Sequence, residues 1–182
     1  MQGFSIQPIF SLFQGQIYRV MVRLEKAQIP FADLYGFIGY CHQCGHYQTV
    51  GWRYLSQATC PDCSLPLTLS GPMWLGTLHD AEFLERMAQL AQDWNWPKRV
   101  ALLEIMQAEA ELPPYFYTVG ELGKRGRMDI PKRDRIIQSL QEAGYRACAT
   151  HINPQAIKTT ATFRECLQIA SQQEYGAPES DA

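Results

Sequence analysis

Four of the six cysteines form two Cys-x-x-Cys pairs, the arrangement in this sequence with the clearest chemistry. Cys41 and Cys44 make the first pair, and Cys60 and Cys63 make the second after fifteen intervening residues. This spacing is typical of a four-cysteine zinc site, because each pair supplies two thiolates to one tetrahedral ion. Four thiolates leave no open position for a substrate. The sequence therefore predicts one structural zinc ion that holds a loop together.

The paired cysteines have an alternative interpretation, and the histidines beside them and the two remaining cysteines are not expected to bind the metal. The paired cysteines could instead be reduced core residues or a redox site. His42 and His46 lie beside the first pair and could each replace a thiolate, but four cysteines already complete the shell, so we expect both histidines at the surface. Cys148 and Cys166 stand alone in strand-like and helix-like patterns, where packing in the core is the expected role.

Basic residues are concentrated in the second half of the sequence. Between Tyr115 and Thr160 there are eight basic and four acidic residues, a net charge of +4, which leaves −6 elsewhere because the whole chain carries −2. The basic residues are Lys124, Arg125, Arg127, Lys132, Arg133, Arg135, Arg146 and Lys158. The first six surround a predicted helix-turn-helix, where cations could follow a nucleic-acid backbone. The alternative is a solvated helix face, which is common.

Three further groups could take part in chemistry or recognition, but each has a structural alternative. The aromatic run 115–117 could stack on RNA, although beside two prolines it is more typical of a packed loop. His79 and Asp80 could suggest acid-base chemistry, yet Asp80 is more simply a helix cap. Trp74 is expected to pack against a turn.

Composition places the chain among ordinary globular proteins. Its 182 residues and 46% apolar content suffice for one good core or two small domains. We find no apolar run of about 18 residues and no signal-peptide pattern at the start, so we expect a cytoplasmic protein without a membrane partner.

Periodicity indicates strands first and helices later. Residues 5–13 and 16–24 are rich in Ile, Phe, Val and Tyr and predict a strand pair, and residues 35–40 predict a strand that enters the first cysteine pair. An isolated hairpin is marginal in water, so the strand pair needs a larger sheet in this chain or in another.

From Asp80 onward the apolar spacing becomes helical. We expect a helix up to about residue 94, a second that starts at Pro97 and stops before Pro113, and a short third one capped by Thr118. Pro131 suits the first turn of a fourth helix, which Gly144 closes. A strand over 145–152 and a last helix over 161–173 complete a layout that resembles a winged helix.

Four stretches resemble the C-terminal part of the tRNA guanine N2-dimethyltransferase family, and together they span most of the chain. Two of them are the strand pair IQPIFSLFQGQIYRVMVRL and the helix pair that starts at PYFYTVGELGKRGRMDIPKRDRIIQSLQEAG. The other two carry the residues of the family pattern. The first is GPMWLGTLHD, with Gly71, Pro72, Trp74, Gly76, Leu78 and His79. The second is GYRACATHINPQAIKTT, with Gly144, Tyr145, Arg146, Thr150, His151, Ile157, Lys158 and Thr159. The resemblance implies tRNA as a partner and methylation of guanine at tRNA position 26. It also implies that the strand pair closes a methyltransferase sheet, and it adds His151 to the candidate RNA-binding residues.

The family's cofactor chemistry is not found in this sequence. The resemblance implies an S-adenosylmethionine-binding domain that should precede Met1, and we find neither a glycine-rich strand-to-helix turn nor an Asp-Pro-Phe-type catalytic motif. The run 112–115, LPPY, lacks the leading Asp or Asn of an N-methyltransferase motif. We therefore expect S-adenosylmethionine to act only through a missing or partner domain, such as a separate catalytic chain, and no methyl transfer by this chain alone.

These observations predict an α+β fold with four regions: a strand pair and linker (1–40), a zinc-ribbon-like module (41–78), a helical and winged-helix-like tRNA-binding domain (79–174) and a disordered tail (175–182). The predicted function is the tRNA-binding portion of such a methyltransferase. The alternative is a standalone zinc-ribbon and winged-helix adaptor for proteins. A complete methyltransferase would need a cofactor site that we cannot locate.

Overall fold

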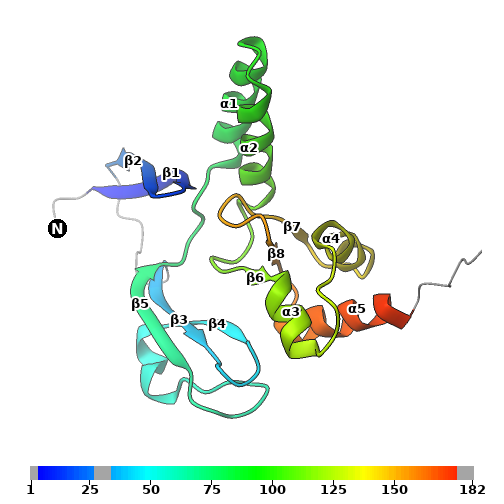
Figure 1. Cartoon of the computed structure of the whole chain (residues 1–182). Helices are drawn as coiled ribbons and strands as arrows, with labels where there is room; N and C mark the ends of the chain where they lie inside the picture. Colours follow the sequence, from blue (N-terminus) through cyan, green and yellow to red (C-terminus); the bar gives the residue numbers. More distant parts are fainter. Residues whose placement is uncertain (1–3, 27–33, 176–182) are drawn as a thin grey trace, which may run out of the picture.

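The computed structural model describes residues 4–26 and 34–175 and shows a mixed α/β chain of small sheets and helices (Figure 1). In Figure 1 the pair of helices stands at the top, the hairpin lies to the left, the cysteine-containing sheet lies below the hairpin, and the C-terminal domain lies to the right. Most of the predicted tail, from 176 onward, lies outside the described residues. Within the described ranges, no helix combines the length and the apolar character needed to cross a membrane.

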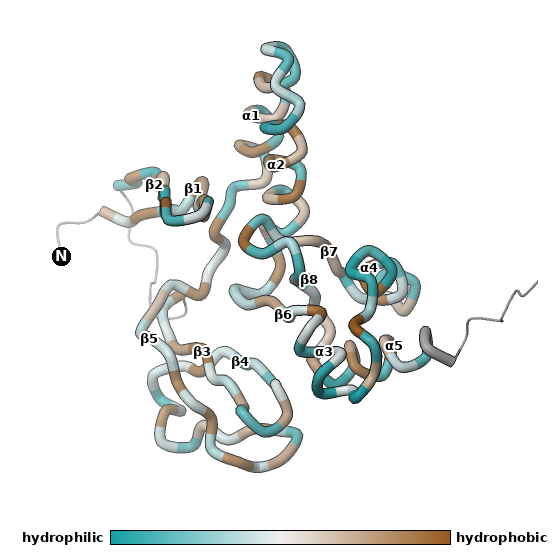
Figure 2. The backbone as a smooth tube through the Cα atoms, viewed as in Figure 1, coloured by the Kyte–Doolittle hydropathy of each residue, from teal (hydrophilic) through white to brown (hydrophobic). Residues whose placement is uncertain are grey.

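The N-terminal hairpin consists of β1 (Ser5–Gln14) and β2 (Ile17–Glu25), as the sequence predicts. Its antiparallel register slips between Pro8 and Phe10, and the turn uses Gly15 at φ 63°, a conformation that favours glycine. In Figure 2 the hairpin carries both brown and teal stretches, in keeping with its mixture of apolar and polar residues. Almost all of β2 is exposed on both faces.

The cysteine-containing region is a three-stranded antiparallel sheet in the order β4-β3-β5. Strand β3 (Tyr35–Tyr40) was predicted, whereas β4 (Tyr47–Val50), the 3-10 helix Trp52–Gln57 and β5 (Thr68–Trp74) were not. Trp74, on the outer strand β5, packs edge-on against Tyr35, which agrees with a packing role.

Two helices, α1 (Ala81–Asp93) and α2 (Pro97–Ala108), form an antiparallel pair. Asp80 caps α1 by accepting a hydrogen bond from the Phe83 amide at 3.0 Å, as predicted. The two helices bury Leu84 and Met106 completely, and Phe10 and Leu12 of the hairpin pack against this core.

The C-terminal domain places three helices around a three-stranded sheet of order β6-β8-β7. Its elements are β6 (Tyr117–Thr118), α3 (Val119–Gly126), α4 (Arg133–Glu142), β7 (Ala147–Ala149), β8 (Ala156–Thr159) and α5 (Phe163–Tyr175). The side chains at its centre are fully buried: Leu122, Ile136, Leu140, Ile157 and Cys166. Tyr117 is buried in the same core, which supports the packed-loop interpretation of the aromatic run.

Three local expectations for this domain need correction. Lys132 is the N-cap of α4, so Pro131 lies before the helix rather than in its first turn. The strand predicted over 145–152 shrinks to three residues, because a turn at 143–144, with Gly144 at φ 88°, precedes it and a bend at 151–152 follows it. Strand β8 was missed, since four residues after Asn153-Pro154 are too few for periodicity to show.

The buried core of the C-terminal domain predicts the effect of a matched pair of truncations. Leu122→Ala should lower the free energy of unfolding by about 2–5 kcal/mol, because Leu122 is fully buried and truncation leaves a cavity. Leu90→Ala, at a helix position that is 50% exposed, should cost less than about 1 kcal/mol. Denaturant unfolding measures both values, and similar losses in the two variants would contradict this packing.

Candidate functional site

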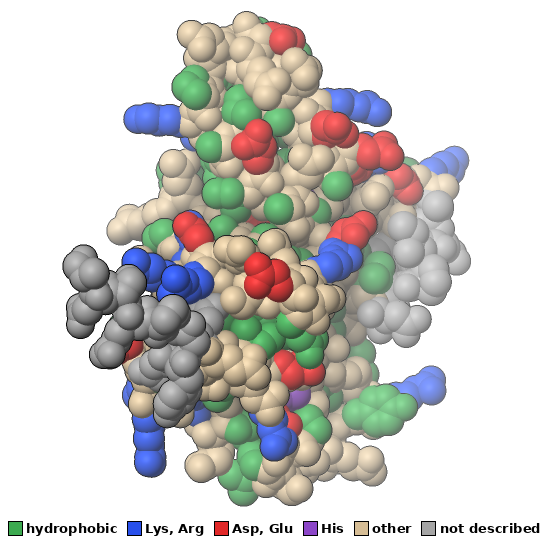
Figure 3. All heavy atoms as spheres, turned by 90° about the vertical axis from the view of Figure 1, so that its right-hand side faces the viewer, with side chains coloured by type: hydrophobic (Ala, Val, Ile, Leu, Met, Phe, Trp, Pro, Cys, Tyr) green, Lys and Arg blue, Asp and Glu red, His purple; other side chains and the backbone are tan. Residues whose placement is uncertain are grey.

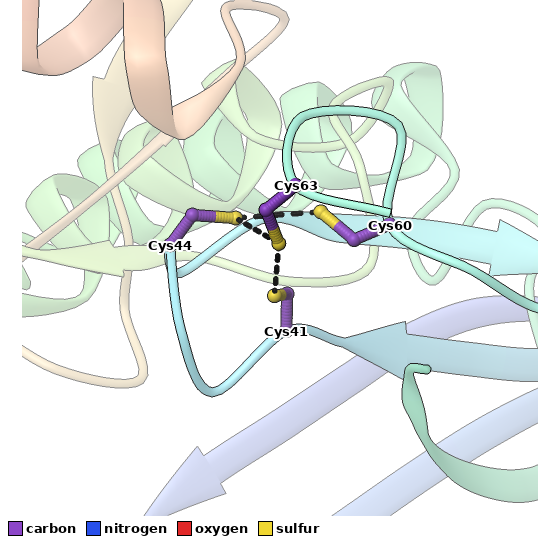
Figure 4. Close-up of side chains that lie close together, drawn as sticks. All are labelled: Cys41, Cys44, Cys60 and Cys63. Atoms are coloured by element: carbon purple, nitrogen blue, oxygen red, sulfur yellow. Dashed lines mark hydrogen bonds between the residues drawn. The ribbon is translucent and has the colours of Figure 1, made fainter. Parts of the chain in front are cut away.

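The four paired cysteines converge on one point (Figure 4). Their sulfur atoms lie 3.4 Å apart for Cys41 and Cys63, 3.4 Å for Cys44 and Cys60, and 4.0 Å for Cys63 and Cys44. A zinc–sulfur bond of about 2.3 Å implies a sulfur–sulfur separation of about 3.8 Å in a tetrahedron. The observed separations lie on both sides of that value, so the four donors fit a zinc ion.

Two equivalent turns bring these sulfurs together. In the first, the Cys41 amide donates to the His46 carbonyl at 2.9 Å, and the Gly45 amide donates to the Cys41 carbonyl at 2.9 Å. The second turn repeats this pattern with Cys60 as its first residue, Ser64 as its fifth and Leu65 as its sixth. Gly45 and Ser64 both have positive φ angles, which the matching geometry of the two turns requires.

Two of the four cysteines are deeply buried, and Cys44 and Cys63 are partly exposed. Cys41 and Cys60 are each only 1% exposed. Burial raises the pKa of the Cys44 thiol to about 12, with the thiols of Cys60 and Cys41 acting in the same direction. A coordinated cation reverses this preference, because a thiol bound to a metal loses its proton. A zinc ion held here would stabilise the loops and supply no reactive position.

The two histidines near the first cysteine pair differ in burial. His42 is exposed, as expected. His46 is 8% exposed and lies 3.1 Å from an Asp62 oxygen, so the expectation of a surface histidine is wrong for this residue. Because His46 follows the αL residue Gly45, its side chain turns back toward the second cysteine pair.

Arg125, one of the candidate phosphate contacts, instead joins the cysteine sheet to the C-terminal domain. Its Nη1 donates to the carbonyls of His42 and Gln43 at 3.1 and 2.8 Å, and its Nη2 donates to the Tyr40 hydroxyl at 2.9 Å. Its Nε donates to Glu121 at 2.9 Å, and the guanidinium lies over the Phe163 ring. These interactions occupy the donors that a phosphate would need.

Four more members of the candidate RNA-binding set have protein partners. Arg133 pairs with Asp134 and donates to the Pro154 carbonyl, and Arg146 pairs with Glu111 at 3.2 Å. Lys158 and His151 are almost fully buried.

Five members of the set are exposed, among them Arg146 in its ion pair with Glu111, and the other four lie close together along the chain. They are Lys124, Arg127, Lys132 and Arg135, at the end of α3, in the α3–α4 connection and in the first turn of α4. In the view from the side of α4 and α5, basic side chains project separately and acidic ones lie between them (Figure 3). Any phosphate contacts on this face are therefore discrete rather than part of one continuous basic patch.

A second cluster, which we call the Glu109 cluster, consists of Glu109, His79, His151 and Lys158. Glu109 is 1% exposed at the C-cap of α2 and hydrogen-bonds to Nδ1 of His151 through Oε1. His79 Nε2 lies 3.8 Å from the same oxygen, and Lys158 Nζ lies 3.5 Å from Oε2.

Charge and hydrogen bonding keep Glu109 ionised. Burial alone would raise the pKa of its carboxyl, but the hydrogen bond from His151, the approach of His79 and the charge of Lys158 hold that pKa well below its usual range. The sequence analysis missed Glu109, because a carboxylate at a helix end gives no signal in spacing or periodicity.

A family model described as N2,N2-dimethylguanosine tRNA methyltransferase matches residues 3–171. The chain therefore belongs to this family, and the resemblance seen in the sequence is confirmed. The tRNA (guanine(26)-N(2))-dimethyltransferase of Methanobrevibacter smithii is 28% identical over 172 residues, which cover 91% of this chain and 44% of that protein. The enzyme of the same name from Methanothermobacter thermautotrophicus is 30% identical over 138 residues, 74% of this chain and 36% of its own length.

A solved structure shares the fold. It is described as a complex of Trm1 from Pyrococcus horikoshii with S-adenosyl-L-methionine, and it superposes with a TM-score of 0.75 at 24% identity, covering 92% of this chain and 44% of that one. The chain thus spans less than half the length of these relatives.

We expect about one zinc per chain in protein purified without added zinc, because the four thiols fit one closed site. Cys60→Ser should lower the melting temperature, since the binding free energy of a structural zinc is also folding free energy. Cys148→Ser is the control, as this cysteine lies outside the cluster. Metal analysis without stoichiometric zinc, together with unchanged melting of Cys60→Ser, would refute the site.

Arg125→Ala should lower the free energy of unfolding by about 1–3 kcal/mol, because two carbonyls and a carboxylate lose their charged donor. Arg125→Lys should recover only part of the loss, since one ammonium group cannot reproduce the planar fork. The neighbouring exposed Lys124→Ala serves as the control, with an expected change within about 0.5 kcal/mol. Equal stabilities of the Arg125 and Lys124 alanine variants would show that Arg125 is not a structural bridge.

Proposed function

We propose that this chain is the tRNA-binding part of a tRNA guanine N2-dimethyltransferase, and that it positions tRNA for methylation by a catalytic domain that the sequence does not contain. The observation that carries the proposal is the group of exposed cations around the α3–α4 connection, in a chain that belongs to a family of tRNA methyltransferases. Phosphate recognition needs accessible cations, and this segment supplies four within twelve residues (124–135).

The order of elements in the C-terminal domain supports a winged-helix type of module. A short strand, two helices and a hairpin follow one another, and the first strand pairs with the last. In helix-turn-helix proteins the second helix of the pair enters the nucleic-acid groove, which here would be α4. Lys132 is the N-cap of α4 and Arg135 lies in its first turn, where they could contact the backbone beside a groove.

The β7–β8 connection, which would be the wing of a winged-helix domain, contacts the N-terminal hairpin of the same chain. His151 in this connection accepts a hydrogen bond from the Phe13 amide of β1 at 3.3 Å. Its side chain is only 3% exposed. We therefore assign the RNA contacts to the helices and their connection rather than to this loop, and we remove His151 and Lys158 from the set of proposed contacts.

The hairpin supplies the surface for the catalytic domain in this proposal. Strand β2 exposes a row of large apolar side chains: Ile17, Tyr18, Val20, Met21, Val22 and Leu24. A hollow of about 500 Å³ lies between the hairpin and α1–α2 and is lined mainly by apolar side chains, including Leu12, Leu90 and Trp94. Exposed apolar surface on a strand with an unpaired edge is typical of an interaction site.

In this proposal the catalytic domain and this chain bind different cofactors. S-adenosylmethionine would bind the catalytic domain and donate the methyl group, and a zinc ion would bind the four cysteines as a structural element. The residues of this chain bind and orient the tRNA and hold the hairpin. A standalone adaptor for protein interactions is less well supported, because the family match covers the hairpin and the C-terminal domain together.

This proposal predicts tRNA binding that weakens steeply with salt, because phosphate contacts release counterions. The triple variant Lys124→Gln, Arg127→Gln, Lys132→Gln should bind tRNA more weakly. Its slope of log affinity against log salt should be shallower by up to about three units, slightly less than one for each cation removed from a phosphate. Binding at several salt concentrations gives both values.

The matched control removes three exposed charges from the helical pair: Arg86→Gln, Lys98→Gln and Arg99→Gln. If the location of the cations matters, this control should keep the wild-type slope of log affinity against log salt. Thermal melting of both triple variants checks that they are folded. Equal losses in the two triple variants would mean that net charge alone governs binding, and no loss in either would refute tRNA binding by the α3–α4 face.

A further inference from the structure

Two of the sequence stretches that resemble the methyltransferase family meet in the Glu109 cluster. His79 lies near the end of the first stretch, and His151 and Lys158 lie in the second, about seventy residues further along the chain. The rings of the two histidines lie edge to face with centroids 5.6 Å apart. The side chains that meet in this cluster are buried, so contact with RNA does not explain their convergence.

Both histidines contact the outer edge of β1 through the nitrogen that faces away from Glu109. The Ser11 amide donates to Nδ1 of His79 at 3.3 Å, and the Phe13 amide donates to Nε2 of His151 at 3.3 Å. The Ile9 carbonyl, on the same edge, accepts from the Asp80 amide at 2.9 Å. Three polar groups of the strand edge are thus satisfied by side chains and backbone from elsewhere in the chain.

These hydrogen bonds fix the proton on each imidazole ring. A nitrogen that accepts a hydrogen bond carries no proton, so a neutral His79 is protonated at Nε2 and a neutral His151 at Nδ1. Both protonated nitrogens then face Oε1 of Glu109. With two neutral rings, the negative charge of Glu109 is balanced by Lys158 alone, and the buried cluster has no net charge.

The same protonation pattern argues against a metal ion between His79, Glu109 and His151, although their donor atoms lie within 4.8 Å of one another. A metal-binding histidine offers its unprotonated nitrogen to the ion and donates its other N–H to an acceptor. Here the nitrogens that face Glu109 carry the protons, and the opposite nitrogens face backbone N–H donors. The Lys158 ammonium group, 3.5 Å from Glu109, would also repel a cation.

We propose that His79 and His151, oriented by Glu109, are positioning residues that cap the outer edge of β1 and hold the hairpin at a fixed angle on the rest of the chain. The cap leaves β2 as the edge available for pairing. If the proposed function is correct, the Glu109 cluster therefore sets where a catalytic domain joined to β2 stands relative to the tRNA-binding face.

The first measurement needs no variant. Nitrogen-15 NMR of the full chain distinguishes protonated from unprotonated imidazole nitrogens, and at neutral pH it should show a proton on Nε2 of His79 and on Nδ1 of His151. The reverse assignment in either ring would overturn the proposal, because that nitrogen could not accept from β1.

The second measurement uses substitutions that keep or remove the acceptor. Asn places its side-chain oxygen where His79 has Nδ1, and Gln places its oxygen where His151 has Nε2. The Ser11 amide should exchange with deuterium about five- to tenfold faster in His79→Ala than in wild type, the equivalent of one hydrogen bond, whereas His79→Asn should restore slow exchange. The Phe13 amide should respond in the same way to His151→Ala and His151→Gln.

The Ile157 amide, in the core of the C-terminal domain, reports global unfolding in the same samples. Two outcomes would overturn the edge cap. In one, the Ser11 and Phe13 amides exchange faster in the Ala variants and are not rescued by Asn or Gln. In the other, they exchange faster only in step with the Ile157 amide, which would mean that the substitutions destabilise the whole chain. A second zinc per chain that is lost in His79→Asn would overturn the proposal in favour of a metal site.

Affinity for tRNA separates this inference from the proposed function. His79→Asn should bind tRNA as wild type does, because His79 lies outside the α3–α4 segment. If wild-type chain fails to bind tRNA but shows the predicted protonation and exchange, the proposed function fails and the edge cap stands. A tenfold loss of tRNA affinity in a folded His79→Asn variant would contradict the separation of the two sites.

Discussion

The arrangement of the chain depends on the contacts of one buried carboxylate, that of Glu109. It lies at the C-cap of α2 and contacts His79 before α1 together with His151 and Lys158 of the C-terminal domain. Through the two imidazoles it also fixes the edge of β1. Removing one partner from such a buried pair costs about 3–5 kcal/mol, because the remaining charge is left uncompensated.

A second charged group joins the cysteine sheet to the C-terminal domain. Arg125 binds the carbonyls of His42 and Gln43 within the first cysteine turn, while its own helix begins the proposed tRNA-binding segment. A zinc ion that fixes this turn would also fix the acceptors of Arg125. In that case the zinc ion would support the position of α3 without contacting RNA.

Local features of the structure were predictable from the sequence, whereas long-range pairing was not. Regular spacing identified the two cysteine pairs, the hairpin and the capped helix that starts after Asp80, because these signals lie within a few residues of each other. Strands β4, β5 and β8 were missed, since short strands depend on partners that are distant in sequence. The predicted domain boundaries stay a prediction.

Charge was the least informative signal for the candidate site. Composition placed Arg125 and Lys158 among the phosphate contacts, but a sequence does not show which cations have found a protein partner. Burial and pairing remove these two from the set, whereas Lys124, Arg127, Lys132 and Arg135 are exposed. Glu109 could not be identified as the partner of Lys158, because about fifty residues separate them without any pattern.

The most direct test of the central claim is hydrogen-deuterium exchange of the full chain with and without tRNA, followed by mass spectrometry. If this chain positions tRNA through the α3–α4 face, amides of peptides that cover 119–142 should gain protection on tRNA binding, while peptides of β2 should not change. Binding that protects only the hairpin, or that leaves 119–142 unchanged, would contradict the account.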